Sequence, residues 1–179
     1  MREKRRAVSA GVYDAAGLAA KQLLITSPFF HSSRHIACYF GQDDEFDCAP
    51  IIEEVWLSGK ICYLPVVSLQ HTECLEFVVY QPNGPLRLNR YNIFEPESGD
   101  RLAAEKLDLV IVPLVAFDDK GHRVGMGGGH YDRTFAFKQL GGDKPKLLGL
   151  GYEFQRVDAV PNDVWDVVLD GVLTEDKLY

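Results

Sequence analysis

The sequence has 179 residues, of which 46% are hydrophobic and 25% are charged, and its formal net charge is −7. These values are typical of one globular domain, and the negative charge argues against a general nucleic-acid binder. No apolar run approaches the roughly 20 residues of a membrane span, and no secretory signal follows the basic first residues. We therefore expect a single domain over residues 1–179, in a cytoplasmic protein that binds neither nucleic acid nor a membrane.

The first half of the chain is expected to form a βαβ unit behind an amino-terminal helix. Apolar residues spaced by three or four predict a helix over residues 2–24, which a Ser-Pro pair would end. A strand over residues 35–40, a helix over 51–57 and a strand over 60–65 come next. A helix between two apolar strands predicts parallel strands joined by a right-handed crossover.

The second half continues the alternation of strands with other segments. Strands are expected over residues 75–80, 107–113, 146–152 and 167–173, with an irregular segment at 90–96. The order of elements predicts one three-layer α/β domain with a mainly parallel central sheet, in a Rossmann-like arrangement that sugar-phosphate isomerases and CoA transferases share. In such sheets, ligands bind at the carboxyl ends of the strands.

A glycine-rich segment follows the buried strand at residues 107–113. Residues 121–133 read Gly-His-Arg-Val-Gly-Met-Gly-Gly-Gly-His-Tyr-Asp-Arg, and the residues after Gly129 have a composition that can start a helix. Glycines let the backbone approach a ligand, and a following helix directs free N–H groups at it, so the segment predicts a phosphate-binding loop. Neither the P-loop nor the G-x-G-x-x-G pattern is present, and a mobile loop or a β-turn is the alternative.

Two further candidates lie outside the glycine segment. Glu45 belongs to an acidic turn after the first strand, where a carboxylate that faces a pocket would accept a hydrogen bond from a ligand. A solvated acidic turn is the alternative. Tyr91 is suited to stack on a flat ligand beside a strand end, or it is ordinary core filler.

The charged candidates near the glycine segment are one arginine and a pair of aspartates. Arg123 is the strongest cation for a phosphate group because it lies within the segment. Asp132 is suited to cap a helix or to bind Mg²⁺. Asp166 is the best second carboxylate for such a cation, with Asp163 and Asp170 as alternatives.

The long pattern Arg-x-Gly-x-Gly-x-Gly-x-Tyr-Asp-Arg resembles the 5-formyltetrahydrofolate cyclo-ligase family, also called methenyltetrahydrofolate synthetases. The resemblance covers nearly the whole chain, from the amino-terminal helix to the Trp165-Asp166 pair. In that family a strand ending in proline, a Phe-Asp turn and this segment form the ATP site. The matching positions are Pro113, Phe117, Asp118, Gly121, Arg123, Gly125, Gly127, Gly129, Tyr131 and Asp132.

The resemblance implies roles for individual residues. ATP would contact Arg123, Val124, Gly125, Met126, Gly127, Gly128, Gly129, His130 and Tyr131, together with Arg5 from the basic amino-terminal cluster. The folate substrate would contact Phe40, Glu45, Tyr91, Met126, Gly128 and His130. Arg123 and Asp132 would be catalytic, and Asp132 and Asp166 would bind Mg²⁺.

The implied activity is the ATP-dependent closure of 5-formyltetrahydrofolate to 5,10-methenyltetrahydrofolate, carried out by a monomer with release of ADP and phosphate. The formyl oxygen would first be phosphorylated, and N10 of the folate would then displace the phosphate. A non-catalytic folate- or nucleotide-binding module is one alternative, because Met126 and Gly128 stand where family members often carry basic residues. A sugar-phosphate isomerase or a CoA-handling enzyme on a similar sheet is the other, and it would need no ATP.

Overall fold

The computed structural model describes residues 1–42, 44–68 and 73–179, so Asp43 of the predicted acidic turn lies outside the described residues. The strands of the main sheet are β1 (His35–Ala37), β2 (Ile61–Val67), β3 (Leu75–Val79), β6 (Arg101–Leu102), β7 (Leu109–Pro113), β10 (Lys146–Leu150) and β11 (Gly171–Leu173). Two hairpins pair β4 (Leu86–Leu88) with β5 (Phe94–Pro96) and β8 (Ala116–Phe117) with β9 (Arg123–Val124). The helices are α1 (Arg2–Arg6), α2 (Ala10–Ile25), α3 (Pro28–His31), α4 (Ala49–Leu57) and α5 (His130–Thr134), with 3₁₀ turns η1 (Ala104–Lys106), η2 (Ala136–Leu140) and η3 (Glu153–Gln155).

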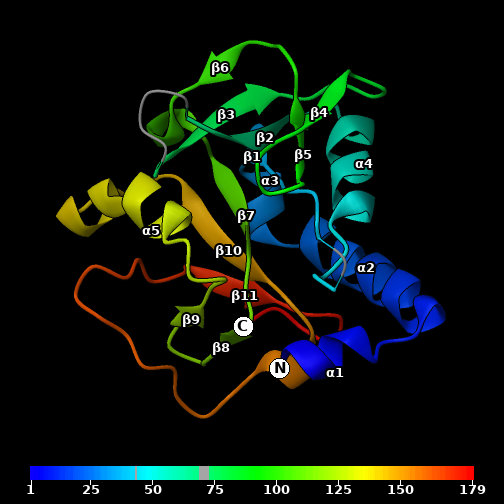
Figure 1. Ribbon diagram of the computed structural model, residues 1–179, viewed down its shortest axis with the longest axis vertical. Helices are drawn as coiled ribbons and strands as arrows, with labels where there is room; N and C mark the ends of the chain where they lie inside the picture. Colours follow the sequence, from blue (N-terminus) through cyan, green and yellow to red (C-terminus); the bar gives the residue numbers. More distant parts are fainter. Residues whose placement is uncertain (43, 69–72) are drawn as a thin grey trace.

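The main sheet has the order β11-β10-β7-β1-β2-β3-β6, and its strands from β11 to β2 are all parallel to one another (Figure 1). β1 and β2 are parallel because α4 connects them, as the sequence predicted. β3 is antiparallel to β2, and β6 is antiparallel to β3. Too few residues separate β2 from β3 for a crossover helix. The α/β fold with a mainly parallel sheet is therefore confirmed, with an antiparallel part at one edge.

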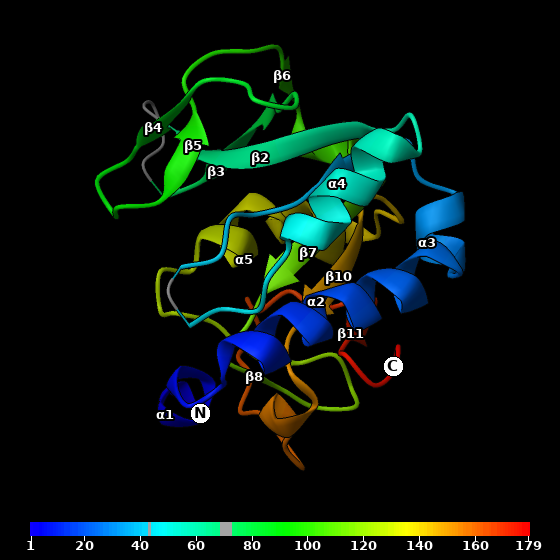
Figure 2. The same ribbon diagram turned by 90° about the vertical axis from the view of Figure 1, so that its right-hand side faces the viewer.

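Helices cover both faces of the sheet (Figures 1 and 2). The helices α2, α3 and α4 lie on one face, and α5 with η2 lies on the other. β7 shows how one strand serves both layers. Leu109 and Ile111 belong to the core on the α2 side, whereas Val110 and Val112 pack in the core that contains Phe135. Both faces of the strand are therefore buried, which explains its continuous apolar sequence.

The predicted amino-terminal helix is in fact two helices. α1 ends at Arg6 and α2 begins at Ala10, so a continuous helix over residues 2–24 is wrong (Figure 2). Ser9 lies at the break with an extended backbone, φ −72° and ψ 155°, as expected of a residue type that favours the N-cap position. The break allows Arg5 of α1 to be buried. In the described part of the chain, no helix has both the length and the apolar character needed to cross a membrane.

The last strand is shorter than predicted. β11 spans only Gly171–Leu173, although Val167 and Leu169 are both buried with one residue between them, as in a strand. Backbone N–H groups of this stretch donate hydrogen bonds to groups outside the main sheet. The Leu169 N–H donates to the carbonyl of Gly121 at 2.9 Å, and the Val167 N–H donates to the carboxylate of Asp132 at 3.1 Å. The stretch therefore has a strand-like pattern of burial without a strand as its partner.

The hairpin β8–β9 follows β7, and its turn and second strand form the start of the glycine segment. The buried strand consequently does not run directly into the glycine segment, as the sequence had suggested, and Arg123 belongs to β9. Gly121 forms the turn of the hairpin with φ 80°. A Cβ atom at this position would lie 2.6 Å from the carbonyl oxygen of Leu169, so glycine is required here by both conformation and space.

Asp118 holds the turn of the same hairpin. Its carboxylate is buried and accepts hydrogen bonds from the backbone N–H groups of Lys120, His122 and Val160 at 2.9–3.0 Å. The imidazole Nδ1 of His122 lies 3.0 Å from its second oxygen. Burial would raise the pKa of Asp118, but these hydrogen bonds lower it to about 2. The Phe-Asp turn of the sequence pattern is therefore a structural anchor for the strand that carries Arg123.

Replacing Asp118 by alanine should lower the free energy of unfolding by about 1–3 kcal/mol at neutral pH, because several buried donors lose their acceptor. The carboxylate stabilises the fold above its ordinary pKa of 3.8, and this contribution is lost as pH falls toward about 2. The difference in the free energy of unfolding between the wild type and Asp118→Ala should therefore become smaller as pH falls from 3.8 toward about 2. Urea unfolding at neutral and at acidic pH measures it.

Asp119→Ala is the control for this experiment. The neighbouring carboxylate is exposed and pairs with Arg156 at the surface. Surface pairs contribute little, so the control should lose much less stability. Equal losses in the Asp118 and Asp119 variants would contradict the structural role given to Asp118.

Candidate functional site

A cavity of about 290 Å³ lies at the carboxyl ends of the parallel strands. β1 and β7 are neighbours in the sheet, although the chain runs from β1 to β2 on one side and from β7 to β10 on the other. Such a reversal leaves a crevice at the strand ends, which is where open α/β sheets bind ligands. The topology of the sheet therefore explains why the cavity opens beside these two strands.

The predicted glycine segment and the predicted substrate segments meet in this cavity. The predicted site residues that line it are Phe40, Glu45, Tyr91, Arg123, Gly125, Met126, Gly128, Gly129, His130, Tyr131 and Asp132. Among the described lining residues, the charged side chains are those of Glu45, Arg123 and Asp132. The cavity is therefore largely apolar, with charge at a few defined points.

The loop after β1 forms one wall of the cavity. β1 ends at Ala37, earlier than predicted, and the chain then leaves the sheet. Phe40 packs edge-on against Tyr80 with 5.4 Å between the ring centroids. The hydroxyl of Tyr39 donates to the carbonyl of Phe46 at 2.9 Å, which folds the loop back on itself.

Glu45 lies in this loop, and its side chain is buried rather than solvated. The residue is only 8% exposed, and its Oε2 accepts a hydrogen bond from the N–H of Gln42 at 2.9 Å. Burial raises the pKa of Glu45 above its ordinary value of 4.5, although the Gln42 hydrogen bond and the charge of Arg5 oppose the rise. The solvated-turn alternative therefore does not describe Glu45.

The loop of the β4–β5 hairpin forms a second wall. The segment at residues 90–96 was predicted to be irregular, but its last three residues form the strand β5. Tyr91 is 44% exposed, so it is not core filler, and its ring lies edge-on to His130 with 5.9 Å between centroids. Its backbone is held from both sides. The Gln42 side chain donates to the carbonyl of Tyr91 at 2.8 Å, and the Tyr91 N–H donates to Asn89 Oδ1 at 2.8 Å.

The glycine segment and α5 form a third wall. Gly129 is the N-cap of α5 with φ 61°, and a Cβ there would lie 2.6 Å from Nη1 of Arg133. His130 fastens the segment to the chain before β3, because its Nδ1 lies 3.0 Å from the carbonyl oxygen of Glu73. α5 is only five residues long. An anion at this wall would therefore be bound by the backbone N–H groups of the glycines more than by a helix dipole.

Arg123 and Asp132 form an ion pair at the edge of the cavity. Nη2 of Arg123 lies 2.6 Å from Oδ1 of Asp132, and the arginine side chain is only 6% exposed. The backbone of Val167 closes the arrangement: its carbonyl accepts from Nη1 of Arg123 at 2.5 Å, and its N–H donates to Oδ1 of Asp132 at 3.1 Å. The segment that contains Asp166 is thus held next to Asp132.

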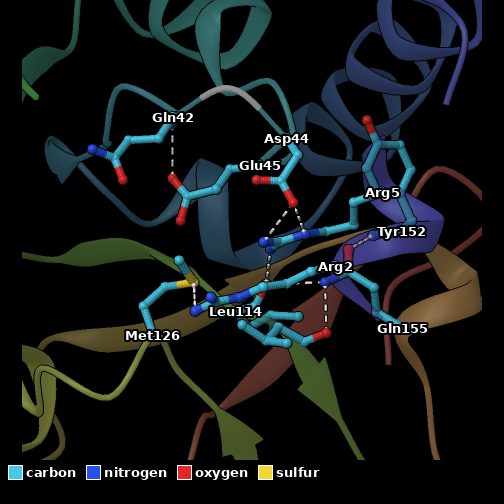
Figure 3. Close-up of polar contacts among 10 residues, drawn as sticks. Arg2, Arg5, Gln42, Asp44, Glu45, Leu114, Met126, Tyr152 and Gln155 are labelled. Carbon is cyan, nitrogen blue, oxygen red and sulfur yellow. Dashed lines mark hydrogen bonds and ion pairs between the residues drawn. The ribbon is translucent and has the colours of Figure 1, made fainter. Parts of the chain in front are cut away.

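Four predicted residues do not line the cavity: Arg5, Val124, Gly127 and Asp166. Arg5 is 3% exposed, and its guanidinium contacts Asp44 (Figure 3). The carboxylate of Asp166 accepts the N–H of Asp163 at 2.8 Å, in a local turn. Among the described residues, no group of three or more His, Cys, Asp or Glu side chains is arranged to hold a metal ion.

The sequence analysis gave no ligand role to several residues that line the cavity. These are Tyr39, Gln42, Pro65, Val67, Leu75, Asn89, Ile93 and Phe94. Most are apolar residues at strand ends or in the β4–β5 hairpin, and a single sequence does not separate them from core residues. The rule that ligands bind at strand ends was the one available signal for Tyr39 and Pro65.

The fold and the cavity define an α/β protein with a cavity at the switch point of a mainly parallel sheet, where such proteins bind ligands. Comparison with known proteins identifies it further. The model of the 5-formyltetrahydrofolate cyclo-ligase family matches residues 1–175, and the chain belongs to this family. The family expected from the sequence is therefore confirmed, and with it an ATP-using ligase of folate one-carbon metabolism.

Individual relatives match over nearly the full chain. The 5-formyltetrahydrofolate cyclo-ligase of Escherichia coli strain K12 is 36% identical over 181 residues, covering 100% of this chain and 98% of its own length. The mouse cyclo-ligase is 28% identical, covering 99% and 91%. The solution structure of 5,10-methenyltetrahydrofolate synthetase from Aquifex aeolicus superposes with a TM-score of 0.81 at 30% identity, covering 98% of this chain and 86% of that chain. Full-length similarity thus assigns this chain the cyclo-ligase activity.

Proposed function

We propose that the cavity is the site of the cyclo-ligase reaction, in which 5-formyltetrahydrofolate and ATP give 5,10-methenyltetrahydrofolate, ADP and phosphate. The observation that carries this proposal is the meeting of the glycine segment, the Arg123–Asp132 pair and the walls of Glu45 and Tyr91 in one cavity. An apolar cavity with a few convergent polar groups suits a flat heterocycle. The proposed active unit is the monomer.

ATP is assigned to the glycine side of the cavity. The triphosphate takes Arg123 as its cation, because Arg123 is the arginine that lines the cavity. The surrounding contacts come from Gly125, Met126, Gly128, Gly129, His130 and Tyr131, which line the cavity, and from their chain neighbours Val124 and Gly127, mainly through backbone N–H groups. Arg5 is left out of this set because it is buried in an ion pair with Asp44.

5-Formyltetrahydrofolate is assigned to the opposite side. Glu45 accepts hydrogen bonds from the N–H groups of the pterin, and Tyr91 stacks on a flat part of the molecule. The remaining contacts come from Phe40, Met126, Gly128 and His130, which line the same cavity. The formyl group then lies toward the glycine segment, where the γ-phosphate of ATP is bound.

Mg²⁺ is assigned to Asp132 and Asp166. Mg²⁺ binds nucleotides through one or two carboxylates, with phosphate oxygens and water completing six ligands, so a preformed cluster of three carboxylates is not required. The residues present fit this need. Oδ1 of Asp132 is held by Arg123 and by the N–H of Val167, the residue after Asp166. The second oxygen of Asp132 and the carboxylate of Asp166 are the atoms assigned to the ion.

The chemistry requires positioning and charge neutralisation more than a protein nucleophile. The formyl oxygen attacks the γ-phosphorus of ATP, the bond to ADP breaks, and an imidate phosphate forms. N10 then attacks the formyl carbon, the carbon–oxygen bond breaks, and the N10 proton and phosphate leave as the ring closes. Arg123 stabilises charge on the transferring phosphoryl group, and the cavity walls hold N10 near the formyl carbon. When bound, Mg²⁺ neutralises charge on the phosphate oxygens.

An absorbance assay tests the proposed reaction. The purified protein is mixed with 5-formyltetrahydrofolate, ATP and Mg²⁺, and the conjugated methenyl product is followed over time. A signal that requires both ATP and Mg²⁺ is expected. Binding of both ligands without product would support the non-catalytic module, and turnover without ATP would contradict the proposal.

Asp132→Asn should lower kcat by roughly 100-fold or more, because a nucleotide-bound metal contributes several kcal/mol of charge stabilisation. The amide keeps the size of the side chain, so the fold should be retained by circular dichroism. Paramagnetic resonance with Mn²⁺ in place of Mg²⁺ gives an independent readout: the variant should bind less Mn²⁺ in the presence of ATP. Asp143→Asn, at an exposed position before β10, is the control. Unchanged turnover and Mn²⁺ binding in Asp132→Asn would refute the metal assignment.

The KM for 5-formyltetrahydrofolate should rise as pH falls through the pKa of Glu45, because protonation removes the charge that binds the pterin. Burial raises this pKa, so the rise should begin above pH 4.5. Glu45→Gln should have a high KM that lacks this pH dependence. The KM for 5-formyltetrahydrofolate of both proteins is measured from initial rates at saturating ATP between about pH 5 and 8. An identical pH profile in wild type and Glu45→Gln would show that Glu45 does not bind the substrate.

A further inference from the structure

Arg5 is a cation inside the protein, although it belongs to a basic cluster at the amino terminus. Its side chain is 1% exposed, whereas Arg2, Lys4 and Arg6 of the same helix are exposed. The guanidinium meets Asp44, with Nε at 3.2 Å and Nη2 at 3.1 Å from Oδ2 (Figure 3). Burial of an arginine in this way is unusual unless the charge is paired, and Asp44 provides the pairing.

The same guanidinium joins three segments that are far apart in the sequence. Nη1 of Arg5 donates to the carbonyl of Leu114 at 3.2 Å, directly after the end of β7. Gln155 donates to the same carbonyl at 2.9 Å, so Leu114 is fixed from two directions. α1, the loop after β1 and the end of β7 therefore meet at Arg5 (Figure 3).

The loop that Arg5 holds is the loop that presents Glu45 to the cavity. Asp44 is the residue immediately before Glu45, and Oε2 of Glu45 accepts the N–H of Gln42. The Gln42 side chain reaches across to the carbonyl of Tyr91 at 2.8 Å. The loop is thus fastened on one side to the Tyr91 wall and on the other to Arg5. The first contact is at the surface, whereas the second is buried and charged.

We propose that Arg5 is a positioning residue for the folate: by pairing with Asp44 it holds Glu45 at the cavity, and it does not contact ATP. The inference rests on the proposed role of Glu45. It departs from the expectation that basic residues at the amino terminus bind phosphate, because the buried guanidinium pairs with Asp44 and donates from Nη1 to the Leu114 carbonyl, and Arg5 does not line the cavity. The two roles differ in a measurable way, since one changes the affinity for folate and the other changes the affinity for ATP.

The test compares kcat and both KM values in Arg5→Met, Asp44→Asn and the double variant. Each single variant should raise the KM for 5-formyltetrahydrofolate by on the order of tenfold, with the KM for ATP changed by less than about twofold. The double variant should be no worse than the more affected single variant, because both changes break the same pair. Asp44→Asn leaves the hydrophobic contacts of Arg5 in place and serves if Arg5→Met is poorly folded.

Arg6→Met is the matched control, because it removes a positive charge from the same helix at an exposed position. It should leave both KM values unchanged within about twofold. Equilibrium binding of 5-formyltetrahydrofolate, followed by protein fluorescence, checks that the changes in KM are changes in affinity. Melting temperatures of all variants separate loss of folding from loss of binding.

The outcomes separate this inference from the function on which it rests. A raised KM for ATP with an unchanged KM for folate in Arg5→Met would overturn the inference, and so would strictly additive effects in the double variant. If Glu45→Gln raises the KM for folate but neither Arg5→Met nor Asp44→Asn does, the inference fails alone. If Glu45→Gln has no effect either, the proposed role of Glu45 fails first.

Discussion

The ion pair between Arg123 and Asp132 is the interaction on which the arrangement of the cavity depends. It joins β9 to the first turn of α5, and through the N–H and carbonyl of Val167 it also fixes the chain before β11. Residues 125–129, with four of the glycines, lie between Arg123 and Asp132 in the sequence, so the pair fixes the distance that this part of the backbone spans. The arginine is only 6% exposed, and the Coulomb attraction between two charges is stronger where water is excluded than at the surface.

The same pair has a consequence for ligand binding. A phosphate that approaches Arg123 must share the guanidinium with Asp132, and two anions at one cation require a further positive charge. A divalent cation on Asp132 would supply that charge. The assignment of Mg²⁺ to Asp132 and of the triphosphate to Arg123 therefore support each other, because each removes the electrostatic obstacle that the other alone would meet.

The sheet supplies the remaining constraint. β1 and β7 diverge in their connections, and the crevice that results receives the loop of Glu45 from one strand and the segment of Arg123 and Asp132 from the other. The β4–β5 hairpin completes the cavity by bringing Tyr91 against His130. Arg5 and Asp118 lie outside this cavity, and both are buried polar groups that hold a loop in place. The residues that line the cavity are therefore distinct from the buried polar residues that hold its surrounding loops.

The sequence was most informative where a residue pattern has one common structural explanation. Continuous apolar runs predicted β7 and β10, and the glycine pattern predicted a segment that lines a cavity. The sequence was less informative where the burial or the hydrogen-bond partners of a residue differ from those that its sequence pattern indicates. Val167 and Leu169 have the pattern of a strand but bond to Asp132 and Gly121, and Arg5 has the sequence context of an exposed arginine but is buried. Long-range partners decide such cases, and spacing along one chain does not reveal them.

The most direct test of the proposed site is a crystal structure of the protein with 5-formyltetrahydrofolate, Mg²⁺ and a non-hydrolysable analogue of ATP. The phosphates should lie against residues 125–129, the pterin should lie between Glu45 and Tyr91, and the formyl oxygen should face the γ-phosphate. A nucleotide bound away from the cavity at the ends of β1 and β7, or a pterin with no contact to Glu45, would contradict the proposed site.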